Sequence, residues 1–305
     1  MFKQRTLKRI IKIYGIGLHT GKKTKMFLKP AIENTGIIYR RIDMVPFINL
    51  EETSITNSTE LNTCLTNKKG IYIFTIEHLN AAFSCLGIDN VIVEIDGLEI
   101  PIMDGSAMPF IKLLIKAGIQ ELNTAKKFIL VKKKIRVEEK DKWAEIKPYK
   151  GFFVDFTVDF NIKDTNFLLK QRYQMIFSTK LFIKKIACAR TFGFMYNVDL
   201  FKKKGLCLGG NLNCSIVIDK FGKVVNKRGL RFKNEYVCHK ILDTVGDLFT
   251  CGYNIVGAFS GFKSGHKLNN KLIKCFLTDQ NSWEFITLKK NDDVSLKFKI
   301  PIYKK

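Results

Sequence analysis

Two stretches of the chain repeat the same order of apolar and polar positions. In the first, apolar residues recur at helical spacing over 76–86, Gly87 ends the predicted helix, and 90–95 is a predicted strand. In the second, apolar residues recur at the same spacing over 237–249, a glycine again follows, and 254–259 is the predicted strand. A polar motif that contains a histidine opens each repeat. The pattern predicts two related units, each with a helix that leads into a strand.

Outside these repeats, local patterns predict further elements. Strands are expected at 25–29, 36–40, 128–137, 152–160 and 172–177, and helices at 108–117 and 178–187, the second with Ser178 or Thr179 as N-cap. The polar stretch 120–124 is the predicted linker, and 190–212, rich in Gly, Phe and Leu, is a predicted irregular insertion. We therefore expect an α+β fold of two related domains, 1–122 and 126–305, each with a sheet packed on helices.

The charge of the chain is strongly positive, with 52 Lys and Arg against 28 Asp and Glu and a net charge of +24. Such a field attracts phosphates, nucleic acids and anionic membranes. The lysines are scattered, however, and Ile, Asn and Phe are also abundant, so drift in codon usage explains the charge as well as a binding face does. A nucleic-acid-binding protein would interleave aromatic and basic residues or carry a recognisable binding module. We find neither and expect no specific nucleic-acid partner.

The remaining composition is that of a globular protein, with 46% apolar residues in a chain long enough for two domains. Eight cysteines form no CxxC pair, which argues against a thiolate zinc site. The basic N-terminus lacks the apolar run of a signal peptide, and no segment approaches the ~18 apolar residues of a membrane span. We expect a cytoplasmic, thiol-reduced monomer without a membrane span.

The candidate chemistry lies in the two predicted histidine-bearing helices. His239 and Asp243 are four residues apart and share a helix face, and Asp247 follows one turn later. The apolar stripe lies roughly 200° around the axis from these positions. By itself such a pair is also typical of a solvated face. His78, which follows Glu77 in the related helix, completes a three-ligand set that leaves a fourth position for water. Zinc lowers the pKa of that water to about 7, and Glu77 is the candidate base, so the pattern predicts a zinc hydrolase.

Two further histidines lie outside these helices. His266 ends the stretch 263–266 (KSGH) and is the unused partner for Asp247. His19 lies in 15–21 (GIGLHTG), where the third glycine is misplaced for a dinucleotide-binding loop and the preceding segment is basic. These glycines are expected to make a tight turn or to let the backbone approach a ligand.

Six segments together resemble the signature motifs of one enzyme family. They are 15–22 (GIGLHTGK), 75–81 (TIEHLNA), 102–107 (IMDGSA), 189–194 (ARTFGF), 239–248 (HKILDTVGDL) and 263–266 (KSGH). The chain resembles the UDP-3-O-acyl-N-acetylglucosamine deacetylases, zinc enzymes that commit the cell to lipid A synthesis, from its N-terminus to about Thr287. The resemblance implies hydrolysis of the substrate's N-acetyl group, with release of acetate and a free 2-amine, at a site between two related α+β domains.

The resemblance also implies roles for individual residues. The implied zinc ligands are His78, His239 and Asp243, a set that iron(II) also tolerates. The implied catalytic residues are Glu77 as the base that later assists the leaving amine, Thr191 as donor to the oxyanion, and His266, kept protonated by Asp247, as a positive charge and second candidate proton donor. The implied sugar and diphosphate contacts are Leu18, His19, Lys142, Phe160, Phe192 and Lys240. An apolar passage for the acyl chain is expected in the insertion, with Phe194 and Gly210 among its residues.

One departure and two alternatives accompany the resemblance. The family often has His-Pro after the Asp-Phe-Asn that here is 159–161, whereas this chain has Ile162 and Lys163, which bears on the nucleotide contacts near Phe160. A metal hydrolase acting on a different amide would differ only in its substrate. A catalytically inactive scaffold is the other alternative, and the presence of every candidate ligand, base and oxyanion donor argues against it.

Overall fold

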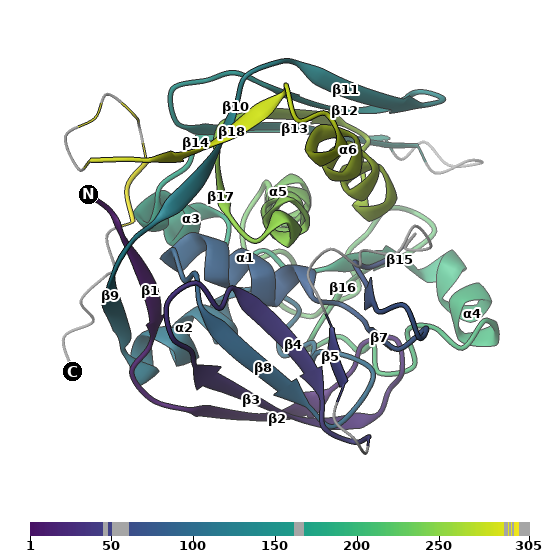
Figure 1. Ribbon diagram of the computed structural model, residues 1–305. Coiled ribbons are helices and arrows are strands. Elements are labelled where there is room, and N and C mark those ends of the chain that lie inside the picture. The colour runs from purple at the N-terminus through teal and green to yellow at the C-terminus, as the bar shows by residue number, and fades with distance from the viewer. Residues whose placement is uncertain are drawn as a thin grey trace.

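The structure is a computed structural model that describes residues 1–44, 48–50, 61–161, 168–289, 292, 294 and 296–298 (Figure 1). The departure at Ile162 and Lys163 therefore lies outside the described residues. Helices and several sheets pack against one another, which confirms the predicted α+β class. The two predicted histidine-bearing helices are present and lie at the centre of the molecule, between the two largest sheets (Figure 1).

The first large sheet comes from the N-terminal part of the chain. In spatial order its strands are β2 (Ile11–Ile16), β3 (Lys23–Pro30), β8 (Val91–Ile95), β4 (Ile37–Arg41) and β5 (Ile48–Leu50). β4 runs parallel to β8, and the other neighbours are antiparallel. Alternate residues of β3, among them Met26 and Leu28, are buried, so one sheet face joins the core with α1 (Glu77–Leu86) and α2 (Met108–Ala117). A short hairpin of β6 (Leu65–Thr66) and β7 (Tyr72–Ile73) precedes α1.

The second large sheet has seven strands and comes from the C-terminal part. Its strands are β10 (Lys127–Val131), β11 (Ile135–Glu139), β12 (Lys142–Lys147), β13 (Phe152–Asn161), β14 (Leu168–Ile176), β17 (Asn254–Phe262) and β18 (Trp283–Thr287). Strand β17 pairs with three other strands: it runs parallel to β10 and β13 and antiparallel to β12. Its helices are α5 (Glu235–Leu248), continued by a short 3₁₀ turn at Phe249–Cys251, and α6 (His266–Thr278). Helices α1 and α5 pack on each other across the centre of the molecule.

Two segments have a different secondary structure from the one that the sequence predicted. The predicted single strand at 128–137 is two strands, because the exposed lysines at 132–134 interrupt the apolar pattern between β10 and β11. The predicted linker at 120–124 forms β9 (Ile119–Ala125), which pairs antiparallel with β1 (Lys3–Leu7). Its polar composition fits a two-stranded ribbon that is exposed along much of one strand. The domain boundaries themselves remain a prediction.

The predicted insertion at 190–212 is regular over its first half, so the expectation of an irregular segment was wrong there. It forms β15 (Phe192–Phe194), parallel to β16 (Ile216–Ile218), and then α4 (Met195–Lys203). The glycine and aromatic content concealed these short elements. The helix before the insertion, α3 (Thr179–Lys185), begins as expected, because the Ser178 side chain accepts a hydrogen bond from the backbone N–H of Leu181 at 3.2 Å.

Candidate active site

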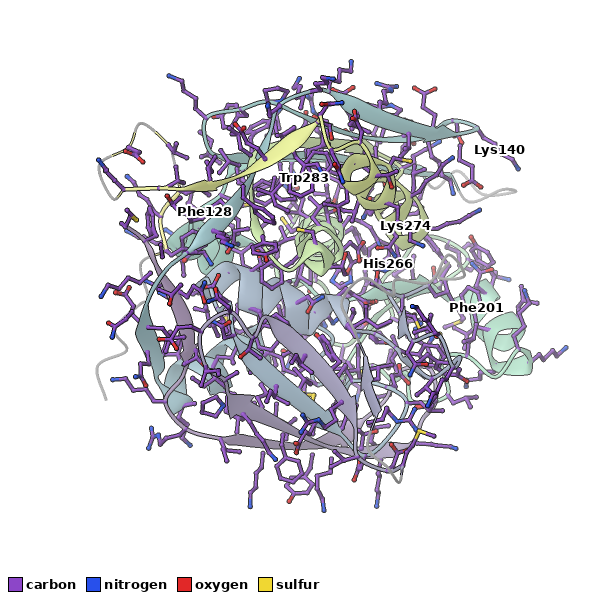
Figure 2. All side chains as sticks on the ribbon, viewed as in Figure 1. Phe128, Lys140, Phe201, His266, Lys274 and Trp283 are labelled. Atoms are coloured by element: carbon purple, nitrogen blue, oxygen red, sulfur yellow. The ribbon has the colours of Figure 1, made fainter. Side chains whose placement is uncertain are left out.

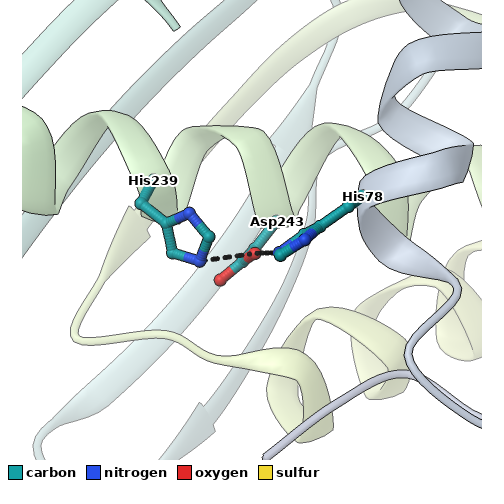
Figure 3. Close-up of side chains that lie close together, drawn as sticks. All are labelled: His78, His239 and Asp243. Carbon is teal, nitrogen blue, oxygen red and sulfur yellow. Dashed lines mark ion pairs between the residues drawn. The ribbon is translucent and has the colours of Figure 1, made fainter. Parts of the chain in front are cut away.

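Three predicted metal ligands meet where α1 packs on α5 (Figure 3). His78 lies in the first turn of α1, while His239 and Asp243 are one turn apart on α5. The Oδ1 atom of Asp243 is 3.4 Å from Nε2 of His78 and 3.2 Å from Nε2 of His239. All three side chains are buried, and each offers one ligand atom within 4.8 Å of the others.

The hydrogen bonding of this trio and the neutral state of His239 suit a divalent cation. His239 places its Nδ1 atom 3.0 Å from the carbonyl oxygen of Ala189, which orients its Nε2 toward Asp243. Burial lowers the pKa of His239 to about 3, so its imidazole is neutral and able to act as a ligand. The Oδ1 atom of Asp243 is buried and makes no hydrogen bond within the part of the chain that the structure describes. Two imidazole nitrogens around an unsatisfied carboxylate oxygen form a donor set that fits zinc.

Glu77 lies beside the trio as a buried carboxyl group. Its Oε2 atom accepts a hydrogen bond from the backbone N–H of Thr63 at 3.0 Å, and its Oε1 atom is 3.8 Å from Nε2 of His266. Burial raises the pKa of Glu77 to about 6, although His266 and His78 oppose the shift. A carboxyl group with a pKa close to neutrality can both accept and return a proton.

His266, at the start of α6, forms a charged pair with Asp247 of α5. Its Nδ1 atom is 3.0 Å from Oδ1 and 3.1 Å from Oδ2 of Asp247. Burial alone would lower the pKa of His266, but Asp247 and Glu77 outweigh it and raise the pKa to about 9. The Nε2 atom faces the trio, 3.7 Å from Oδ2 of Asp243. A protonated imidazole therefore adds a positive charge to the site at neutral pH.

Two neighbouring cavities contain the predicted substrate contacts. The first, of about 320 Å³, is mainly apolar, and the second, of about 660 Å³, carries more charged groups; both reach Leu61 and Phe201. Figure 2 labels Phe201 of α4 and His266 at the start of α6, which lies nearer the middle of the molecule. The first cavity is lined by Leu18, His19, Thr191, Phe192, Phe194 and Gly210. The second is lined by Lys142, Phe160 and Lys240. The structure thus divides the predicted contacts between an apolar cavity and a cavity lined by charged residues of both signs.

Two other predicted site residues, Lys240 and Thr191, have contacts that connect them to the rest of the site. The ammonium group of Lys240 is 2.7 Å from Oδ2 of Asp243, so this lysine joins the second cavity to the trio. The backbone N–H of Thr191 donates to the carbonyl of Gly105 at 2.8 Å. Gly105 has φ +81°, and a Cβ there would lie 1.8 Å from the carbonyl oxygen of Cys214. The motif at 102–107 therefore supports the loop that carries Thr191.

The sequence reasoning missed several supporting residues. Thr63 donates its hydroxyl to Asp247 at 2.6 Å, and the amide of Asn269 donates to the same carboxylate at 2.8 Å. Asn269 lies three residues after His266 and so shares its helix face, a signal that was available in the sequence. Thr63 lies in an irregular stretch before β6 and α1, and no local sequence pattern marks it as a site residue.

Glu99 is the other residue that was missed, and it organises the turn that carries His19. Its buried carboxylate accepts hydrogen bonds from the backbone N–H groups of His19 and Thr20, both at 2.8 Å. It also accepts from the hydroxyls of Thr20 at 2.8 Å and Thr75 at 3.0 Å. Four donors from two segments converge on one side chain, so Glu99 ties the motif at 15–22 to the segment before α1.

The fold and the site together are those of a metal-dependent hydrolase, with a candidate His-His-Asp ligand set, a buried acid and an imidazolium close together. A family model for UDP-3-O-acyl N-acetylglycosamine deacetylase (LpxC) matches residues 4–278, and the chain belongs to this family. The predicted resemblance is therefore confirmed, and with it the reaction: hydrolysis of a carbon–nitrogen amide bond in UDP-3-O-acyl-N-acetylglucosamine during lipid A biosynthesis. No helix among the described residues is long and apolar enough to cross a membrane.

Proposed function

We propose that the metal of this deacetylase is zinc, held by His78, His239 and Asp243. The observation that carries the proposal is the buried Oδ1 atom of Asp243, which makes no hydrogen bond among the described residues and lies 3.2 Å from Nε2 of His239 and 3.4 Å from Nε2 of His78. Two nitrogen ligands and one carboxylate are a usual catalytic zinc set that keeps a position open. When bound, zinc would act as a Lewis acid toward the amide carbonyl and would acidify a neighbouring water.

We also propose that Glu77 and His266 divide the proton and charge transfers. Glu77 accepts a proton from the attacking water, for which its pKa of about 6 is suited. His266, held in its protonated form by Asp247, stabilises the negative charge that develops on the carbonyl oxygen. Thr191 lines the adjoining cavity and supplies a hydroxyl donor to the same charge. The proton that the departing 2-amine needs comes from Glu77 or from His266.

The two cavities accommodate the two chemically different ends of the substrate. The first is lined by Leu18, Phe192 and Phe194 and suits an acyl chain. The second contains Lys142 and Lys240 and suits a diphosphate. The acidic residues Glu139, Asp141 and Asp159 also line it. Ion pairs with Lys267 at 3.0 Å and Lys263 at 2.8 Å offset the charges of Glu139 and Asp141.

We propose a monomeric enzyme in a reducing compartment, the cytoplasm. Eight cysteines lie in the described residues, and none of them forms a disulfide there. Reduced thiols are the normal state in that compartment. A monomer is sufficient for the chemistry because every candidate ligand and catalytic side chain comes from one chain. Size-exclusion chromatography with light scattering would test the oligomeric state.

The experiment that tests the proposed metal is acetate release from UDP-3-O-acyl-N-acetylglucosamine by the purified protein. Chelation should abolish release, and back-titration with zinc should restore it at one equivalent per chain. Iron(II), added under anaerobic conditions, is the comparison metal. Restoration by iron(II) but not by zinc would refute the assignment of zinc, and release that resists full metal removal would refute the metal site itself. Release from other acetamido sugars at equal rates would point to the alternative substrate.

A further inference from the structure

Helix α4 lies at the edge of the molecule (Figure 1), and several of its apolar side chains are exposed. Tyr196 is 53% exposed and Leu200 is 49% exposed. Val198 and Phe201, on another face of the same helix, line the first cavity. The helix therefore packs with one side on the cavity wall and presents Tyr196 and Leu200 to the surroundings.

The loop after α4 continues this apolar surface. Leu208 is 52% exposed and Leu212 is 45% exposed. The loop backbone is held in place, because the N–H of Leu208 donates to the carbonyl of His19 at 3.1 Å and that of Gly209 donates to Leu18 at 3.0 Å. These leucines thus project from an anchored backbone. Leu212 also lines the first cavity, so the apolar surface extends to the cavity wall.

A run of positive charge borders the same surface. Lys202, Lys203 and Lys204 are all exposed at the C-terminal end of α4. The stretch 195–215 contains these three lysines and a single acidic residue, Asp199. Leucine and tyrosine beside clustered lysines is the composition of helices that lie in the interface of an anionic bilayer. The net charge of +24 adds a long-range attraction toward such a surface.

We propose that α4 and the loop to Leu212 form a docking surface for an anionic lipid bilayer. Tyr196, Leu200 and Leu208 enter the interface between headgroups and acyl chains, while Lys203 and Lys204 contact anionic headgroups. An acidic protein would satisfy the lysines, but it would not account for separate leucines exposed on both the helix and the loop. Docking through this surface brings the wall of the apolar cavity next to the bilayer.

The test is co-sedimentation of the metal-loaded enzyme with vesicles of phosphatidylcholine, alone or with about one third phosphatidylglycerol. The full-length protein should pellet with the anionic vesicles only, and added salt should reduce binding. Leu200→Ser combined with Leu208→Ser should weaken partitioning by at least about tenfold, because two leucines leave the interface. Lys203→Gln with Lys204→Gln should weaken it by about fivefold or more. None of these four residues lines either cavity, so acetate release from dispersed substrate reports on correct folding.

The matched control is Lys132→Gln with Lys133→Gln, which removes the same charge from an exposed run of lysines between β10 and β11. This control should keep binding close to that of the unmodified protein. Equal losses from the two lysine pairs would show a nonspecific effect of net charge and overturn the proposal. Absence of vesicle binding, or unchanged binding after the leucine substitutions, would overturn it as well, and an acidic protein would then become the better candidate partner.

Discussion

Gly246 of α5 lies directly against the backbone of Glu77 in α1. A Cβ atom at Gly246 would be 2.0 Å from the carbonyl oxygen of Glu77 and 2.9 Å from its Cα atom. Because Glu77 and His78 are the first residues of α1, this contact sets the distance between the two helices that supply the trio. The glycine in the HKILDTVGDL motif is therefore a packing requirement of the site.

Gly246→Ala should separate the two helices and weaken the site. In an ordinary helix interior this change stabilises by up to about 1 kcal/mol, but here we expect a loss of roughly 1–3 kcal/mol in unfolding free energy. Urea denaturation and zinc affinity should both report it. Gly193→Ala is the control, because a Cβ there would meet nothing within 4 Å. An alanine variant as stable as the parent would contradict this account of the contact.

Substitutions in the trio and at Glu77 should separate metal binding from proton transfer. His78→Ala and Asp243→Ala should lose zinc, because each removes one of three ligands. Glu77→Gln should keep zinc and lower kcat by about 10²–10⁴-fold, because the carboxyl that moves the proton is gone while its shape remains. Metal analysis of the purified variants, beside acetate release, measures both effects. Normal turnover by Glu77→Gln would remove Glu77 from the mechanism.

In the metal-free protein, His266 should remain protonated well above neutral pH. Its folded pKa of about 9 exceeds the ordinary 6.5, so the stabilisation it contributes is fully present below about pH 6.5 and disappears as the pH rises through 9. NMR titration of the four histidines can test this. His239, with a pKa of about 3, should stay neutral over the same range and serves as the internal control. Asp247→Asn should lower the pKa of His266, and an unchanged value would contradict the pairing.

Glu99→Gln should disturb substrate binding more than chemistry. The amide nitrogen that replaces one carboxylate oxygen cannot accept, so the N–H of His19 or that of Thr20 loses its acceptor, and a buried donor left unpaired costs about 1–3 kcal/mol. The turn that carries Leu18 and His19 should loosen, so we expect a higher KM with a smaller change in kcat. Glu121→Gln is the control, because Glu121 is half-exposed and pairs only at the surface with Arg5. A lower kcat at unchanged KM would argue against a positioning role.

Local patterns were sufficient for the elements that carry the site. Helical spacing of apolar residues predicted α1 and α5, since periodicity records which face of a segment is buried. The pairing of His239 with Asp243 also followed, because residues four apart on a helix are neighbours whatever surrounds them. Spacing failed where polar or glycine-rich stretches adopt regular structure, as in β9 and α4.

Patterns and motifs along the chain were thus enough to predict the fold class, the two central helices and the family, and they also gave the candidate ligand set. The folded structure was needed to show that His78 meets a pair some 160 residues away, that Glu99 holds the turn of His19, and that Thr63 joins Glu77 to Asp247. The physical reason is that spacing along the chain governs contacts within one helix. Contacts between distant segments depend on how two sheets and their helices close around a shared core.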